Sequence, residues 1–152
     1  GAYIPYIIDT VKGKVRPERI SWLLWRMLGL TYYLSALLSD GADLFTLGEL
    51  CGQGLIFLFS LKYGVGGKSR FDVLSLIVAL AAFSLLFILD GVIVGLLLAL
   101  AVDAIGAVLT LRKLSIDPTS ESKLFWACSA TASLLALVSL KELSTENIVF
   151  PA

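Results

Sequence analysis

The sequence predicts an all-α integral membrane protein in which two parallel helix repeats are joined by a linker helix. Hydrophobic residues make up 58% of its 152 residues, and its mean hydropathy is +0.91. Soluble domains are only roughly 45–50% apolar. The chain also holds several apolar segments of about twenty residues, the length of a membrane span. Finally, a shift of 101 residues aligns its two halves without a gap. A soluble all-helical bundle is the alternative.

Five full-length apolar segments are predicted to be spanning helices, because a backbone inside a bilayer must satisfy its own hydrogen bonds. They are residues 20–38, 43–63, 71–89, 91–111 and 121–140. Turn formers such as "SDGAD" and "YGVGGKSR" separate them. A shorter apolar run, Tyr3–Val11, covers about half a membrane, and "STENIVFPA" looks like the start of another helix. We therefore expect an incomplete first helix and an absent last one; the alternative is that the native chain ends here.

Basic residues are concentrated in alternate loops, which predicts the orientation of the chain. Ten of the twelve Lys and Arg residues lie near the first, third and fifth connections, one lies elsewhere in a loop, and Arg26 lies within a span. The positive-inside rule places the three basic connections in the cytoplasm. The predicted location is a prokaryotic inner (plasma) membrane. The ten residues are Lys12, Lys14, Arg16, Arg19, Lys62, Lys68, Arg70, Arg112, Lys113 and Lys123.

The stretch "GKVRPERISWLLW" (13–25) is repeated in a diverged form as "LSIDPTSESKLFW" (114–126). In each copy an apolar helix leads into a basic turn, and a second apolar helix leads out of it. Both copies enter from the same side, which predicts a parallel repeat of the kind found in some transporters. The aligned pairs are Lys12 and Lys113, Pro17 and Pro118, Ser21 and Ser122, and Trp25 and Trp126.

This arrangement resembles the PQ-loop superfamily, which includes the SWEET sugar facilitators and the half-size bacterial SemiSWEETs; the chain is similar to a bacterial branch of that superfamily. The segment "YIPYIIDTVKGKVRPERISW" carries the resemblance, with Pro5 matching the proline of the first helix and Pro17 and Pro118 the loop proline. The resemblance implies a first repeat at 1–65, a linker helix at 66–90 and a second repeat at 91–152. It also implies a small-solute facilitator that works by alternating access, with Pro5 as a hinge.

Ionisable residues within predicted spans are costly and indicate function. Asp103, Glu49 and Arg26 are three such residues that lie well inside their spans. Counted along their helices, Asp103 and Arg26 lie at depths that differ by about one turn. We therefore expect Asp103 to face the interior, within reach of either Arg26 or a polar cavity that contains Gln53. A purely structural buried ion pair is the alternative to a role in transport.

Two further pairs are candidate substrate-binding residues. Trp25 and Trp126 occupy equivalent positions, so a parallel two-fold arrangement lets them face each other across a central site. Aromatic faces suit sugars, nucleobases and organic cations; the alternative is an interfacial position at the membrane boundary. Gln53 lies one helical turn after Glu49. Together these two residues offer a polar lining.

Composition also limits the classes of function. A net charge of zero argues against nucleic acid as the main partner, and histidine is absent. Cys51 and Cys128 lie in apolar runs and are expected to be small buried hydrophobes. The sequence predicts no enzyme, metal site or cofactor. The predicted partners are the lipid bilayer, a small polar solute and a further chain bound at the small-residue faces "GELCG" and "GVIVG". The alternative functions are a structural or assembly subunit of a larger membrane complex, or a cargo or lipid receptor.

Overall fold

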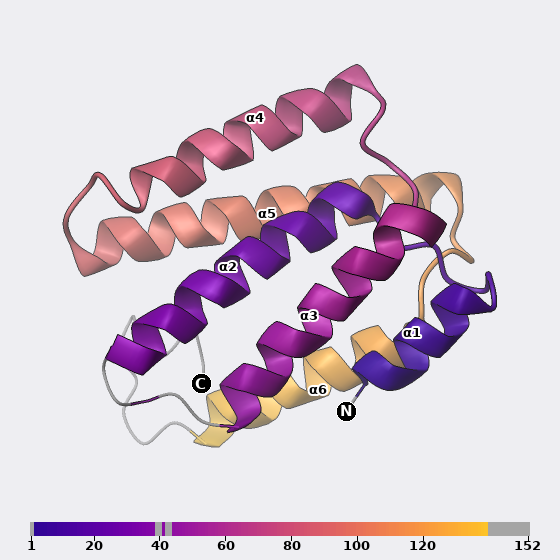
Figure 1. Ribbon diagram of the computed structural model, residues 1–152, viewed down its shortest axis with the longest axis horizontal. Helices are drawn as coiled ribbons and strands as arrows, with labels where there is room; N and C mark the ends of the chain where they lie inside the picture. Colours follow the sequence, from indigo (N-terminus) through magenta and orange to yellow (C-terminus); the bar gives the residue numbers. More distant parts are fainter. Residues whose placement is uncertain (1, 39–40, 42–43, 140–152) are drawn as a thin grey trace.

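A computed structural model describes residues 2–38, 41 and 44–139, whose regular secondary structure is helical apart from one isolated bridge between Glu18 and Val65 (Figure 1). The all-helical prediction is therefore confirmed. The expected segment ends at residues 43 and 140, and the C-terminal apolar run, lie outside the described residues. The helices are α1 (Tyr3–Val11), α2 (Arg19–Leu38), α3 (Leu44–Tyr63), α4 (Arg70–Leu85), α5 (Val92–Ile116) and α6 (Lys123–Ser139).

Two helix ends differ from the expected segments. Helix α4 begins with a capping box formed by Ser69 and Asp72, and it ends at Leu85 rather than Leu89. The residues that follow continue as tight turns, with Leu86 N bonded to Phe83 O at 3.1 Å. Helix α5 extends five residues beyond Leu111, to Ile116, and this extension contains Arg112 and Lys113, which form ion pairs with Asp72 and Glu121.

One described helix, α5, is both long and apolar enough to cross a membrane, judged by length and composition. Helices α4 and α6 are described over 16 and 17 residues, somewhat short of the ~20 residues that cover the hydrocarbon core. The structure therefore supports one spanning helix, and the prediction of five remains a prediction.

The helices pack in a continuous order around two hydrophobic clusters. Helix α5 contacts α4 on one side and α2 on the other; α3 lies between α2 and α1, and α1 also contacts α6 (Figure 1). One cluster joins α1, α2, α3 and α6, and the other joins α2, α4 and α5. The first contains Tyr6, Val15, Trp22, Ile56 and Phe125, and the second Ile20, Leu24, Ala79, Val102 and Leu109.

The two copies of the repeated stretch meet at one end of the molecule. Helices α1 and α5 both end there, and α2 and α6 both begin there (Figure 1). Arg16 forms an ion pair with Asp117, and the Trp25 and Trp126 rings lie 5.8 Å apart between centroids. Each pair is separated by the repeat length of 101 residues. Contacts between equivalent residues are expected close to a two-fold axis, so Pro17 and Pro118 share one end.

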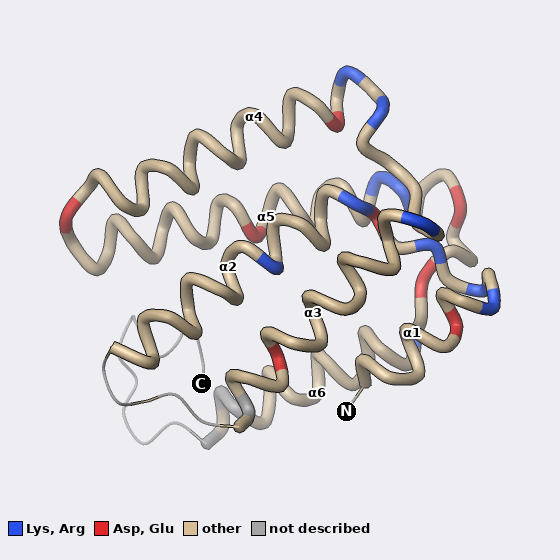
Figure 2. The backbone as a smooth tube through the Cα atoms, in the orientation of Figure 1, with Lys and Arg blue, Asp and Glu red and all other residues tan. Residues whose placement is uncertain are grey.

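That end carries the basic loops. Figure 2 shows that nearly all the described Lys and Arg residues gather at the connections after α1, α3 and α5. We call this the basic end. Arg26 lies within α2 and is not part of these connections.

Only some of the small residues that were expected to pack helices together lie at close helix contacts. A Cβ atom on Gly52 would lie 2.5 Å from the Tyr3 ring, so this glycine allows α1 to approach α3 closely. Gly48, in the same "GELCG" stretch, has nothing within 4 Å of a Cβ position. Cys51 and Cys128 are both exposed in the isolated chain. The expectation that they are buried was wrong, because their helix faces point away from the neighbouring helices.

Candidate functional site

The two predicted tryptophans touch each other instead of flanking an open space. Trp25 from α2 and Trp126 from α6 meet edge to face, and Trp22 packs against Trp25 with ring centroids 5.2 Å apart. Phe125 lies beside Trp22 and Trp126. This aromatic cluster closes the space between the first and second copies of the repeat.

Asp103 and Arg26 lie close to the cluster but have different partners. The Asp103 carboxylate interacts with the Trp25 side chain. The Trp25 indole nitrogen also lies 3.0 Å from the Cβ position of Gly106, one turn further along α5. Arg26 Nη1 donates a 2.7 Å hydrogen bond to Leu50 O on α3. None of the three ion pairs among the described residues includes Asp103 or Arg26.

The expected Asp103–Arg26 ion pair is therefore not formed. Successive residues of an α-helix point about 100° apart. Trp25 faces α5, so Arg26 is turned towards α3, where its guanidinium lies beside Gly54. The similar depths of Asp103 and Arg26 in the sequence do not indicate in which direction each side chain points.

Glu49 and Gln53 come together as expected, and α1 adds a tyrosine that the sequence did not indicate. The Tyr3 hydroxyl donates a hydrogen bond to Glu49 Oε2 and also interacts with Gln53. Gln53 Oε1 is buried without a hydrogen-bond partner, next to Gly29 on α2. Tyr3, Glu49 and Gln53 thus form a cluster of polar side chains between α1, α2 and α3, which are otherwise apolar helices.

The three motif prolines occupy different environments. Pro5 lies in the first turn of α1, where a proline removes no helical hydrogen bond. Pro17 is fully buried, and its carbonyl accepts a 2.9 Å hydrogen bond from Val65 N. Pro118 is exposed. The loop proline is thus part of the packed structure in the first copy only.

A buried acid that the sequence analysis missed holds the basic end together. Glu121 accepts hydrogen bonds from the Tyr6 hydroxyl at 2.9 Å and from Trp126 Nε1 at 3.0 Å, and it forms an ion pair with Lys113. Lys113 also donates a 2.8 Å hydrogen bond to Arg16 O. These contacts join both copies of the repeat. The signal available in the sequence was the position of Glu121 next to a basic loop and just before an apolar helix.

A second buried acid, Glu18, caps the start of α2. Glu18 is only 3% exposed; its Oε2 atom accepts a hydrogen bond from the backbone nitrogen of Ser21 and lies 2.9 Å from the Ser21 hydroxyl. Ser21 in turn contacts Gly106 O and Thr110 on α5. Burial raises the pKa of Glu18, and Asp72 adds to that effect.

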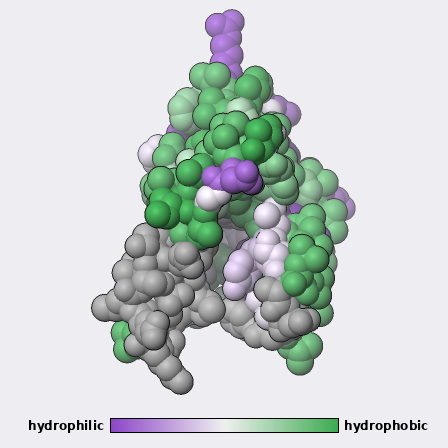
Figure 3. Space-filling view, turned by 90° about the vertical axis from the view of Figure 1, so that its left-hand side faces the viewer, coloured by the Kyte–Doolittle hydropathy of each residue, from purple (hydrophilic) through white to green (hydrophobic). Residues whose placement is uncertain are grey.

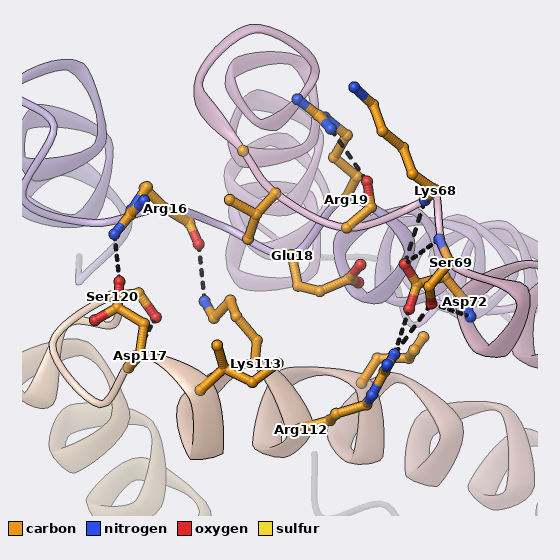
Figure 4. A pocket seen from close by; sticks show the side chains of 15 residues that line it. Arg16, Glu18, Arg19, Lys68, Ser69, Asp72, Arg112, Lys113, Asp117 and Ser120 are labelled. Carbon is orange, nitrogen blue, oxygen red and sulfur yellow. Dashed lines mark hydrogen bonds and ion pairs between the residues drawn. The ribbon is translucent and has the colours of Figure 1, made fainter.

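A cavity of about 580 Å³ opens at the basic end beside Glu18 (Figure 4). The start of α2, the segment after α3, the start of α4 and the end of α5 enclose it. Arg112 is paired with Asp72 across it at 2.9 Å, and Arg16 with Asp117. Its charged side chains are Arg16, Glu18, Arg19, Lys68, Asp72, Arg112, Lys113 and Asp117.

The described residues thus offer two kinds of chemistry. The mid-depth groups supply aromatic faces, a guanidinium and carboxylates, which suit recognition of a polar solute. The basic end supplies ion pairs and hydrogen bonds that join the two copies. No group of three or more His, Cys, Asp or Glu side chains among the described residues is placed to hold a metal ion.

Comparisons with family models, with curated proteins and with solved structures gave no significant match.

The raised pKa of Glu18 predicts how stability depends on pH. Between its unfolded and folded pKa values the native state binds more protons than the unfolded state, so the free energy of unfolding should fall as pH rises through the folded pKa. Glu18→Gln should remove this fall. Thermal unfolding in detergent, followed over a pH series, measures the effect as a difference between variant and wild type.

Asp117→Asn is the matched control for this prediction. Hydrogen bonds from Thr119 and the charge of Arg16 hold the pKa of Asp117 below its usual range, so its contribution is lost as pH falls. The two variants should therefore differ from wild type with opposite pH slopes. Equal slopes would show that Glu18 is not the buried acid described above.

Proposed function

We propose that this protein is an integral membrane carrier of the PQ-loop type that moves a small polar solute by alternating access. The surface of the isolated chain supports a position in a bilayer. Large hydrophobic side chains are exposed on every helix, and the end view in Figure 3 is hydrophobic over most of its described part. Such an extended apolar surface is unusual for a soluble monomer. Examples are Leu58, Leu74, Ile93, Leu97, Leu124 and Leu135.

The orientation follows from the basic end. Its concentration of Lys and Arg in three short connections supports a cytoplasmic position, in a prokaryotic inner membrane. The solute site then comprises the mid-depth residues on α2, α3, α5 and α6. They are Trp25, Arg26, Glu49, Gln53, Asp103 and Trp126.

The observation that carries the proposal is that the two copies of the repeat are held together at the basic end. The Arg16–Asp117 ion pair, the hydrogen bonds from Lys113 to Arg16 O and from Tyr6 to Glu121, and the Trp25–Trp126 contact all join one copy to the other. Polar and ionisable groups lie deeper in the molecule, beyond these contacts. A closed gate between a polar site and one aqueous side is what an alternating-access carrier requires. We call this set of contacts the basic-end gate.

Cysteine accessibility in proteoliposomes tests this function without knowledge of the solute. In a background of Cys51→Ala and Cys128→Ala, a Gln53→Cys reporter should react with a membrane-impermeant maleimide added to either side. A disulfide between Arg16→Cys and Ser120→Cys should lock the gate, because Arg16 N donates a 2.9 Å hydrogen bond to Ser120 O and the two residues are adjacent. Reaction from the basic side should then fall to background and recover on reduction.

Leu97→Cys is the control reporter, since Leu97 is 61% exposed on the apolar face of α5 and should react from neither side. The unlocked single variants Arg16→Cys and Ser120→Cys control for the substitutions themselves. A reporter that reacts from one side only, whether the gate is locked or free, would exclude alternating access. That result would favour a structural subunit or a receptor.

A further inference from the structure

The hydroxyl group of Ser21 has more hydrogen-bonding neighbours than its own proton can serve. Its oxygen lies 2.9 Å from Glu18 Oε2, 2.6 Å from Gly106 O and 3.0 Å from Thr110 Oγ1. Three hydrogen bonds require three protons. The Ser21 and Thr110 hydroxyls supply one each, and the Gly106 carbonyl supplies none. For each of the three contacts to have a proton of its own, Glu18 must supply the third.

The surroundings of Glu18 favour a neutral acid. Its Oε1 atom is buried and has no hydrogen-bond partner. Among the described residues, no cation forms an ion pair with it. A buried carboxylate that lacks such a partner tends to take up a proton. The charged groups around it are Arg19 on its own helix, Lys68 in the segment after α3, Asp72 on α4, and Arg112 and Lys113 on α5.

The neighbouring cations are held by other groups. Arg112 is paired with Asp72, and Lys113 with Glu121. The Arg19 guanidinium donates to Ser60 O and Gly66 O, each at 3.1 Å. In Figure 4 the Lys68 side chain extends away from Glu18. Glu18 itself points into the cavity, which gives a proton a route from the aqueous side.

We propose that Glu18 carries a proton in this closed form and that this proton locks the basic-end gate. Protonated Glu18 donates to Ser21, which also accepts from Thr110 and donates to Gly106 O. Both hydrogen bonds between Ser21 at the start of α2 and helix α5, to Gly106 O and from Thr110, are then formed. When the proton leaves for the cavity, the Glu18 carboxylate and Gly106 O compete for the single Ser21 proton. The charged carboxylate is the stronger acceptor, so the bond from Ser21 to Gly106 O, which joins α2 to α5, is lost. The proton is thus the ion that is coupled to gate opening, a step that rests on the carrier function proposed above.

Infrared spectroscopy tests the protonation itself and assumes no transport. At neutral pH, the difference spectrum of wild type minus Glu18→Gln should show the carbonyl stretch of a protonated carboxylic acid. Wild type minus Asp117→Asn should show no such band, because hydrogen bonds from Thr119 and the charge of Arg16 hold the pKa of Asp117 below its usual range. A carboxylate band in place of the acid band in the Glu18 difference spectrum would overturn the proposal.

The Gln53→Cys reporter tests the effect on the gate. Its reaction from the basic side should accelerate as pH rises through the pKa of Glu18. In Glu18→Gln the rate should stay low at every pH, because the amide NH₂ replaces the acid proton as donor to Ser21. In Ser21→Ala it should stay high at every pH, because the bonds to Gly106 and Glu18 are removed together.

These outcomes separate the lock from the carrier function. A reporter that is open to both sides but insensitive to pH, to Glu18→Gln and to Ser21→Ala would leave the carrier function intact and show that the proton lock is wrong. Ser21→Ala keeps the test valid if Glu18→Gln fails to fold, since its helix start is still capped by Glu18 through the backbone nitrogen of residue 21.

Discussion

Replacing Glu121 with alanine should lower the free energy of unfolding by about 3–5 kcal/mol, because it leaves the Lys113 ammonium buried without its carboxylate. The Lys113 and Glu121 side chains are 9% and 3% exposed. The substitution also removes the acceptor of the Tyr6 and Trp126 hydrogen bonds. Thermal and denaturant unfolding in detergent micelles would measure the loss.

Two further variants show whether the effect comes from the unpaired charge. The double variant Lys113→Met with Glu121→Met should recover part of the stability, since no isolated charge remains. Asp117→Ala breaks an ion pair whose Arg16 side chain is 51% exposed, and such exposed pairs contribute only about 0–1 kcal/mol. A Glu121→Ala loss no larger than that of Asp117→Ala would contradict the buried network.

Gly64→Ala should destabilise the protein by about 1–3 kcal/mol through overpacking. A Cβ atom at this position would lie 2.4 Å from Ser60 O and 2.6 Å from Pro17 O. Both are backbone atoms, and neither can move without disturbing the hydrogen bonds that join Pro17 and Arg19 to Val65. Equilibrium unfolding of the purified variant gives the size of the effect.

Gly48→Ala is the matched control for this substitution. Gly48 lies within α3, and nothing is within 4 Å of its Cβ position. Alanine is favoured over glycine in a helix by roughly 0.5–1 kcal/mol, so this variant should be as stable as wild type or more so. If both variants lost stability equally, close packing at Gly64 would not be the cause.

The positions of the helices could be predicted from the sequence, because hydrophobic length and turn-forming residues are local properties. The first apolar run, Tyr3–Val11, coincides with α1, and the later segments overlap α2 to α6. The ungapped 101-residue spacing predicts a repeat, which stays a prediction; the equivalent residues Trp25 and Trp126 are in contact. Glu49 and Gln53 both interact with the Tyr3 hydroxyl, as expected from their spacing of one turn on the same helix.

The direction and partners of single side chains were decided only by the tertiary structure. Arg26 was expected to face Asp103, but the packing of Trp25 against α5 turns Arg26 towards Leu50 on α3. In the sequence Glu18 precedes its span and Glu121 is the first residue of another. Both are buried because the segments that lead into α2 and α6 meet at the basic end. The depth of a residue and its place in the helical period can be read from a single segment of the sequence. The residues that its side chain contacts depend on how each helix is rotated against its neighbours.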